Sequence, residues 1–126
     1  MKITSFNPYI ITSAPDEVIG LFEALGFERR HMKENINGED IDCVRMKDAN
    51  GYHVDVTRVD RVPRDLMAIR MNVDDFDEGY EFLTSRGFTV APGSQITDTG
   101  SSRAVILLSP SGFGINLVKH IRKEDR

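Results

Sequence analysis

An internal repeat constrains this chain more than any other feature. The stretch Gly51-Tyr52-His53-Val54-Asp55-Val56-Thr57 returns in altered form as Gly112-Phe113-Gly114-Ile115-Asn116-Leu117-Val118, an offset of 112 − 51 = 61 residues. The same shift pairs Gly26 with Gly87 without any insertion. Because these glycines lie at expected helix ends and hairpin turns, where backbone geometry is most demanding, we interpret the chain as two copies of one unit.

Each copy is predicted to contain a strand, a helix and three further strands. Runs of β-branched and aromatic residues favour the strands, and apolar residues at helical spacing favour the helices. The first copy is predicted to have strands at 3–12, 27–33, 41–47 and 52–59, with a helix capped by Ser13 and ended by Gly26. The second is predicted to have strands at 66–73, 88–91, 103–108 and 113–118, with a helix opened by residues 74–76 and closed by Gly87.

Length and composition predict one soluble domain spanning residues 1–126. Module one covers about 3–59, a polar linker about 60–65, module two about 66–118, and a charged, solvated tail 119–126. The chain is 40% hydrophobic and 29% charged, and no apolar run approaches the roughly 20 residues of a membrane span. The first residues lack the apolar centre of a signal peptide, so a cytoplasmic location is expected.

Charge and cysteine content narrow the function classes. The net charge of −4 gives no electrostatic reason to expect a nucleic acid or an anionic membrane as partner. Cys43 is the only cysteine, which excludes an internal disulfide, a thiolate zinc cluster and a Cys-x-x-Cys redox pair.

Two tandem βαβββ modules, with Leu25-Gly26-Phe27 after the first helix and Ser109-Pro110-Ser111-Gly112-Phe113 before the last strand, resemble the vicinal oxygen chelate superfamily. This superfamily includes glyoxalase I, bleomycin-resistance proteins and extradiol dioxygenases. The resemblance implies an α+β fold in which the two modules form a half-open barrel. It also implies that the enzymes bind a divalent metal through four side chains on the first and last strands of the modules.

The resemblance places those four metal-ligand positions at Asn7, Asp55, Ala68 and Asn116. Alanine has no donor atom, an amide is a weak ligand, and only Asp55 brings negative charge. We therefore expect neither a metal nor another cofactor. A carboxylate paired with an arginine is the favoured interpretation of Asp55.

Strand alternation predicts which side chains face the barrel interior. Tyr52, Val54 and Val56 are expected against the first helix, and Phe113, Ile115 and Leu117 against the second. The predicted ligand-binding cavity is lined by Asn7, Tyr9, Arg45, His53, Asp55, Arg70 and Asn116. The arginines favour a ligand with a carboxylate or phosphate, although one arginine paired with Asp55 and the other in solvent explains them equally well.

Other polar side chains are interpreted conservatively. His53 is either a general base, a substitute metal ligand or, more commonly, a wall residue, whereas His31 and His120 receive no role. The polar segment 93–102 is either a flap or an ordinary hairpin loop.

Three functions remain open. The first is a metal-free protein that binds a small molecule of unknown identity. The alternative is a divalent-metal-dependent lyase, isomerase or dioxygenase with an atypical ligand set around Asp55. The third is an interaction module without a cavity. The open strand edges of a half-barrel also predict a homodimer.

Overall fold

The computed structural model describes residues 1–33 and 43–120, except for the side chains of residues 31–33. The chain divides into two compact units. The first unit is Asn7–Ala68, and the second consists of Met1–Phe6 together with the residues from Ile69 onward. Both divisions fall inside strands. Residues 60–65, predicted as the linker, form turns and bends.

The two units have the same strand order, which bears out the predicted α+β fold of two βαβββ units. In chain order the first unit contains β1 (Ile3–Thr12) from Asn7 onward, α1 (Pro15–Ala24), β2 (Glu28–Lys33), β3 (Cys43–Lys47) and β4 (His53–Arg58). They are followed by β5 (Leu66–Val73), α2 (Phe76–Thr84), β6 (Thr89–Val90), β7 (Thr97–Asp98), β8 (Ser102–Leu108) and β9 (Gly114–His120). The strands run β1-β4-β3-β2 in one unit and β5-β9-β8-β6 in the other.

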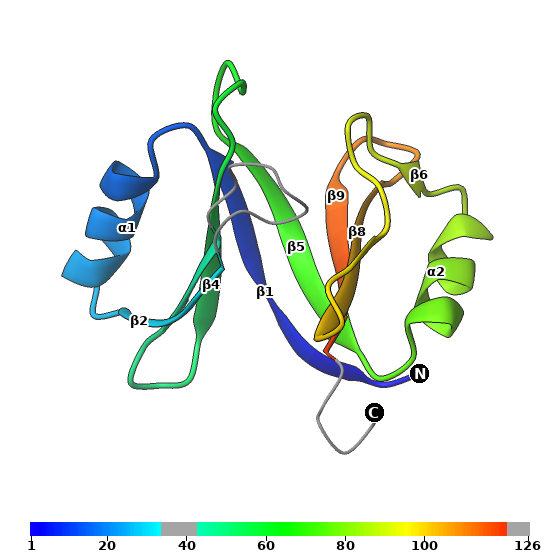
Figure 1. Ribbon diagram of the computed structural model, residues 1–126, viewed down its shortest axis with the longest axis horizontal. Coiled ribbons are helices and arrows are strands. Elements are labelled where there is room, and N and C mark those ends of the chain that lie inside the picture. Colours follow the sequence, from blue (N-terminus) through cyan, green and yellow to red (C-terminus); the bar gives the residue numbers. More distant parts are fainter. Residues whose placement is uncertain (34–42, 121–126) are drawn as a thin grey trace. The chain divides into compact units, whose positions relative to one another are not determined.

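Each helix covers one face of the strands in its own unit (Figure 1). In the first unit α1 packs on β4, and Ile19 joins a core of Val44, Met46, Val54 and Val56. In the second unit α2 packs on β9 over a core formed by Met71, Val73, Phe76, Leu83, Val105, Leu107, Ile115 and Leu117. Burial of these apolar side chains stabilises each unit and fixes which face of its strands turns away from the helix.

The glycines of the repeat end the helices and close the hairpins. Gly26 and Gly87 have φ angles of 102° and 92°, and Gly51 and Gly112 have φ angles of 89° and 109°. At each hairpin one side chain accepts two backbone N–H groups: Asp48 Oδ1 from Asn50 and Tyr52, and Ser109 Oγ from Gly112 and Phe113. The same turn is therefore built twice, with a carboxylate in one unit and a hydroxyl in the other.

Two predictions about burial and capping are wrong for local reasons. Tyr52 and Phe113 are 67% and 50% exposed, because they lie in the hairpin turns before β4 and β9, where strand alternation does not apply. The N-cap of α1 is Ala14, without a side-chain hydrogen bond, rather than Ser13. Thr12 Oγ1 instead accepts the Ala14 N–H at 3.0 Å.

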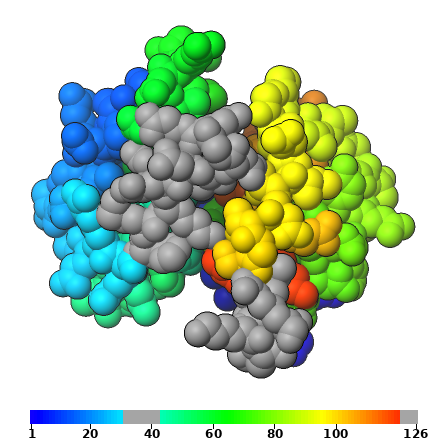
Figure 2. All heavy atoms as spheres, in the orientation of Figure 1, coloured from blue at the N-terminus to red at the C-terminus, as the bar shows by residue number. Residues whose placement is uncertain are grey.

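The boundaries of several strands also differ from the prediction. β9 continues to His120, so the first two residues of the predicted tail belong to the sheet. The remaining tail residues, 121–126, lie outside the described residues. Residues 41–42, at the start of the predicted strand 41–47, also lie outside them. The segment 93–102 contains the short strand β7, which pairs with β8. Much of this segment lies at the surface of the second unit (Figure 2).

Neither α1 nor α2, the two helices within residues 1–33 and 43–120, has the length and apolar character needed to cross a membrane.

Candidate functional site

Buried polar side chains gather on the strand faces that turn away from the helices. In the first unit Asn7, Asp55 and Thr57 alternate with the apolar core residues of β1 and β4, and each is at most 5% exposed. In the second unit Arg70, Asn72 and Asn116 are buried in the same manner on β5 and β9. Because buried polar groups need partners, the bonds that these side chains form determine what each face can do.

Three strands of the first unit bring Asn7, Arg45 and Asp55 together. Asp55 lies opposite Arg45 of β3 and opposite Tyr9 of the parallel strand β1. Asp55 Oδ2 accepts hydrogen bonds from Arg45 Nη1 at 2.8 Å and from Asn7 Nδ2 at 2.6 Å. Arg45 Nη1 also lies 3.4 Å from Asn7 Oδ1. We call these three residues the Asp55 network.

The Asp55 network balances a buried charge. The Asp55 side chain is 0% exposed and that of Arg45 is 16% exposed. A carboxylate removed from water to this degree is stable only when it is paired, and hydrogen bonds to charged partners are the strongest that a protein offers. Arg45 supplies the positive charge, and Asn7 supplies a second donor to the same oxygen.

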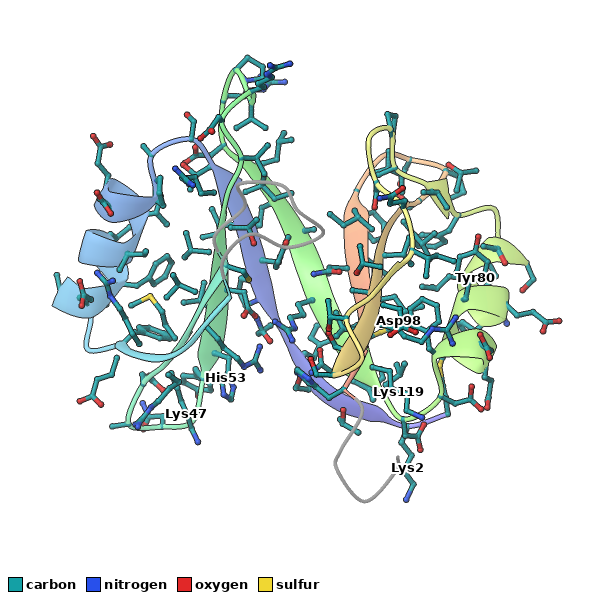
Figure 3. All side chains as sticks on the ribbon, viewed as in Figure 1. Lys2, Lys47, His53, Tyr80, Asp98 and Lys119 are labelled. Atoms are coloured by element: carbon teal, nitrogen blue, oxygen red, sulfur yellow. The ribbon has the colours of Figure 1, made fainter. Side chains whose placement is uncertain are left out.

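Tyr9 and His53, also predicted to line the cavity, occupy different parts of the first unit. Tyr9 is 9% exposed and faces the Asp55 position in register. His53 is half-buried at the start of β4, where it pairs in register with Lys47 (Figure 3). On β4, Thr57 Oγ1 donates a hydrogen bond to Cys43 Sγ at 3.4 Å.

The Asp55 network does not fit a divalent metal of the kind that the superfamily resemblance implies. Three of the four ligand positions, Asn7, Asp55 and Ala68, lie in the first unit. Asp55 Oδ2 already receives two N–H donors, one of them cationic, and Ala68 has no donor atom. A cation at Asp55 would meet the guanidinium at close range, which costs electrostatic free energy. Within residues 1–33 and 43–120, no group of three or more His, Cys, Asp or Glu side chains is arranged to bind a metal ion.

Arg70 and Asn116, the remaining predicted cavity residues, belong to the second unit. Arg70 Nε donates to Asn72 Oδ1 at 3.0 Å, and Arg70 Nη2 lies 3.2 Å from His120 Nε2. Asn116 is buried and pairs in register with Ile106. The predicted set is thus divided between the two units, with Asn7, Tyr9, Arg45, His53 and Asp55 in one and Arg70 and Asn116 in the other.

Sequence reasoning missed His120, which it assigned to the tail without a role. In the structure His120 ends β9 opposite Ser102 of β8 and contacts Arg70. The strand alternation that places Asn116 and Val118 on the inward face also places His120 there. His120 was not predicted because the predicted strand ended at Val118.

Two groups at the start of α2 have shifted pKa values. The backbone N–H of Lys2, bonded to Asp74 Oδ1 at 2.6 Å, holds the pKa of Asp74 below its ordinary value. A hydrogen bond to Glu78 raises the pKa of the Met1 amino group. Both groups are exposed and hold Met1–Phe6 to the rest of the second unit, so we assign them to structure rather than to the site.

Comparison with solved structures supports the fold. A methylmalonyl-CoA epimerase of Streptomyces coelicolor in complex with 2-nitronate-propionyl-CoA is 16% identical, with a TM-score of 0.69 over 96% of this chain and 100% of that one. A glyoxalase/bleomycin resistance protein/dioxygenase superfamily member from Vibrio splendidus is 15% identical, with a TM-score of 0.60 over 91% and 97%. A glyoxalase I mutant from Zea mays is 13% identical, with a TM-score of 0.66 over 94% of this chain and 43% of that one.

These similarities confirm the predicted resemblance to the vicinal oxygen chelate superfamily at the level of the fold. Neither a family model nor a curated protein matches the sequence. The fold alone does not assign a reaction, because function depends on the residues of the site.

Proposed function

We propose that this chain, which has the glyoxalase/bleomycin-resistance fold, is a metal-free protein that binds a small molecule through the polar strand faces opposite its helices. The observation that carries the proposal is the pairing of Asp55 with Arg45 and Asn7 at 2.8 and 2.6 Å. At a position where the resemblance implies a metal ligand, the one carboxylate is neutralised by an arginine. A buried polar face of this kind orients a ligand through hydrogen bonds.

Metal analysis combined with thermal unfolding tests this proposal. Protein purified without added metal should contain no stoichiometric transition metal. Manganese, nickel, zinc and iron should leave its Tm unchanged, because a ligand that binds only the native state raises Tm. One equivalent of bound metal, or a saturable Tm shift with any of these ions, would overturn the metal-free assignment.

An arginine variant tests whether metal binding is prevented because Arg45 neutralises Asp55 or because the site has too few metal-ligand atoms. Arg45→Met keeps an unbranched apolar stem but removes the guanidinium, and with it the positive charge that opposes a cation at Asp55. A Tm shift with divalent ions that appears only in this variant would assign metal exclusion to Arg45. Ile106→Met, at the position equivalent to Arg45 in the second unit, is the matched control, since Ile106 is uncharged and pairs with Asn116.

A ligand screen tests the binding function itself. Arg45 and Arg70 on the polar faces favour compounds with a carboxylate or phosphate, because guanidinium groups bind such anions through paired hydrogen bonds. One structural neighbour binds 2-nitronate-propionyl-CoA, an anionic acyl thioester, so acyl thioesters belong in the screen. A Tm increase with such compounds that saturates at a fixed stoichiometry supports binding. A screen without any saturable ligand would count against it.

The second candidate function is an enzyme, and it is favoured by the neighbours themselves, which include methylmalonyl-CoA epimerase and glyoxalase I. A metal-dependent lyase, isomerase or dioxygenase would then have to use an atypical ligand set around Asp55. Assays of epimerase and glyoxalase I activity, with and without divalent ions, distinguish the two candidates. Metal-dependent turnover that is lost in Asp55→Asn would favour the enzyme.

We also propose that the protein is a homodimer in the cytoplasm; the dimer is supported by the resemblance to a fold with open strand edges. Light scattering at tens of micromolar, on the order of ordinary assay concentrations, should give twice the mass of one chain. A monomeric mass would refute the dimer and leave the ligand-binding proposal unaffected.

A further inference from the structure

Asn116 is a buried amide without a hydrogen-bond partner in the part of the chain that the structure describes. The residue is 7% exposed, yet no hydrogen bond or ion pair joins its side chain to another described residue. Every other buried polar side chain in residues 1–33 and 43–120 has at least one hydrogen bond. A buried polar group left without a partner costs free energy, so Asn116 requires an explanation.

Apolar residues lie beside Asn116 on its own strand and on β8. β9 lies between β5 and β8 (Figure 1), and the residue opposite Asn116 on β8 is Ile106. Gly114 and Val118, the nearest residues of β9 on the same face, are both buried, whereas the alternate residues of β9 belong to the core under α2. None of these neighbouring side chains has a donor or acceptor atom. The amide therefore lies on the polar face of the second unit, against apolar walls.

The first unit shows how a side chain at this position is partnered. Asp55, which the offset of 61 residues makes equivalent to Asn116, accepts a hydrogen bond at 2.8 Å from Arg45 of the facing strand. The same offset replaces Arg45 by Ile106. A neutralised charge in one unit thus corresponds to an uncharged amide beside an isoleucine in the other.

The chemistry of the amide narrows the group that fits it. Asn116 Nδ2 donates hydrogen bonds and Oδ1 accepts them, so a group with an acceptor and a donor side by side satisfies both atoms. Asparagine binds adenine in DNA in this two-point manner. A carboxylate can accept from Nδ2, but it has no proton for Oδ1. A buried water commonly has about three polar partners, and the apolar neighbours of Asn116 provide none of them.

A second amide lies on the polar face of the neighbouring strand β5. Asn72 is also 7% exposed, and its Oδ1 accepts from Arg70 Nε at 3.0 Å. Asn72 Nδ2 donates to no other described residue. The polar face of the second unit therefore has a further uncharged donor for a carbonyl oxygen.

We propose that Asn116 binds a neutral amide group of the ligand. The ligand N–H donates to Asn116 Oδ1, its carbonyl oxygen accepts from Asn116 Nδ2, and its apolar part packs against Ile106 and Val118. The inference rests on the proposed function and makes it more specific, because it names the class of group that the second unit recognises. Carboxamides and lactams carry such a group.

Nuclear magnetic resonance of the whole protein, labelled with ¹⁵N in its asparagine side chains, tests this inference with benzamide as the probe. Benzamide combines an amide with an apolar ring. It should shift the side-chain signals of Asn116 in a saturable manner, with a Kd on the order of millimolar for a compound of this size. Asn116→Leu identifies these signals by removing them. Asn50, exposed in a turn of the first unit, is the internal control, and its signals should not move.

Two analogues with the same ring test which atoms matter. Acetophenone keeps the carbonyl oxygen but has no N–H for Asn116 Oδ1, so it should bind roughly fivefold more weakly, as expected for one lost hydrogen bond. Benzoate has two acceptor oxygens and a negative charge, and it should also bind at Asn116 more weakly than benzamide. Equal binding of benzamide and acetophenone, or tighter binding of benzoate at Asn116, would overturn the amide assignment.

Thermal unfolding of two leucine variants gives an independent test. Asn116→Leu replaces an unpartnered amide with an apolar side chain of similar size, so Tm should stay the same or rise. Asn7→Leu is the matched variant in the first unit, and it should lower Tm because it removes the 2.6 Å hydrogen bond to Asp55. Equal losses of Tm would show that Asn116 has a partner within the fold, and the inference would fail.

Failure of this inference can be told apart from failure of the proposed function. If benzamide leaves the Asn116 signals unchanged while a compound of the ligand screen binds elsewhere on the polar faces, only the amide inference fails. If neither benzamide nor any compound of the screen binds, both fail. A stoichiometric metal would overturn the metal-free assignment, and the response of Asn116 to benzamide would still decide the amide inference.

Discussion

The two units share a strand order and a repeat offset of 61 residues, yet they place their charged side chains at different positions of the polar faces. In the first unit a carboxylate and a guanidinium from neighbouring strands neutralise one another at 2.8 Å. In the second unit the equivalent positions hold Asn116 and Ile106, and the cation comes from Arg70 on the first strand of the unit, equivalent to Tyr9. Its contacts there include an amide oxygen and an imidazole nitrogen.

The core positions behave differently from the polar positions. Val44, Met46, Val54 and Val56 are matched by Val105, Leu107, Ile115 and Leu117, and all of these side chains are at most 9% exposed. Each must fill space between a helix and a sheet, so size and apolar character are retained. The opposite face carries no such packing requirement, and it is where the two units diverge and where binding chemistry can arise.

Removing the Asp55 carboxylate should have the largest effect. Asp55→Ala leaves Arg45 and Asn7 without the acceptor that they share, and breaking a buried ion pair from one side typically costs about 3–5 kcal/mol. The matched change Asn116→Ala removes a neutral amide and should cost about 1–2 kcal/mol. Urea denaturation monitored by circular dichroism measures both free energies of unfolding. Equal losses would show that the charge pair does not distinguish the two faces.

Truncating an equivalent pair of core residues should affect both units alike. Met46 and Leu107 are both 0% exposed, and each change to alanine should lower the free energy of unfolding by about 2–5 kcal/mol. The difference between the two losses should be smaller than that between Asp55→Ala and Asn116→Ala. The same denaturation experiment tests this, and a large loss in one unit alone would contradict the interpretation of one core built twice.

Helix capping should give effects of opposite sign. Asp75 caps α2, with Oδ1 accepting the Glu78 N–H at 3.0 Å, so Asp75→Ala should cost about 1 kcal/mol. Its equivalent in α1 is Ala14, which makes no side-chain cap, and Ala14→Asp should stabilise the protein by several tenths of a kcal/mol to about 1 kcal/mol. Thermal unfolding of both variants checks the signs. A destabilising Ala14→Asp would mean that its φ of −123° and ψ of 63° do not suit a side-chain cap.

The sequence predicted those features that depend on local rules and repeat in both units. Glycines at positive φ, apolar alternation and the strand order follow from such rules, and Asp55 and Arg45 were selected as inward-facing on the same basis. The predictions failed where the alternation was started too early, at Tyr52 and Phe113, or stopped too soon, at His120. β9 reaches His120 because β8 begins at Ser102 and supplies pairing partners. A two-residue strand such as β7 has no pattern long enough to detect.

The smallest predicted effect concerns the hydrogen bond between Lys2 and Asp74, which has no counterpart in the first unit because Ser13 occupies the equivalent position. Because the folded pKa of Asp74 is lowered from 3.8, its contribution to stability is present above that pH and is lost as the pH falls through the folded value. Asp74→Asn should therefore lower Tm slightly near neutral pH and flatten the acid dependence of Tm below about pH 4. Tm measured across this range tests the difference. An unchanged acid dependence in Asp74→Asn would mean that this carboxylate does not help to hold Met1–Phe6 to the rest of the second unit.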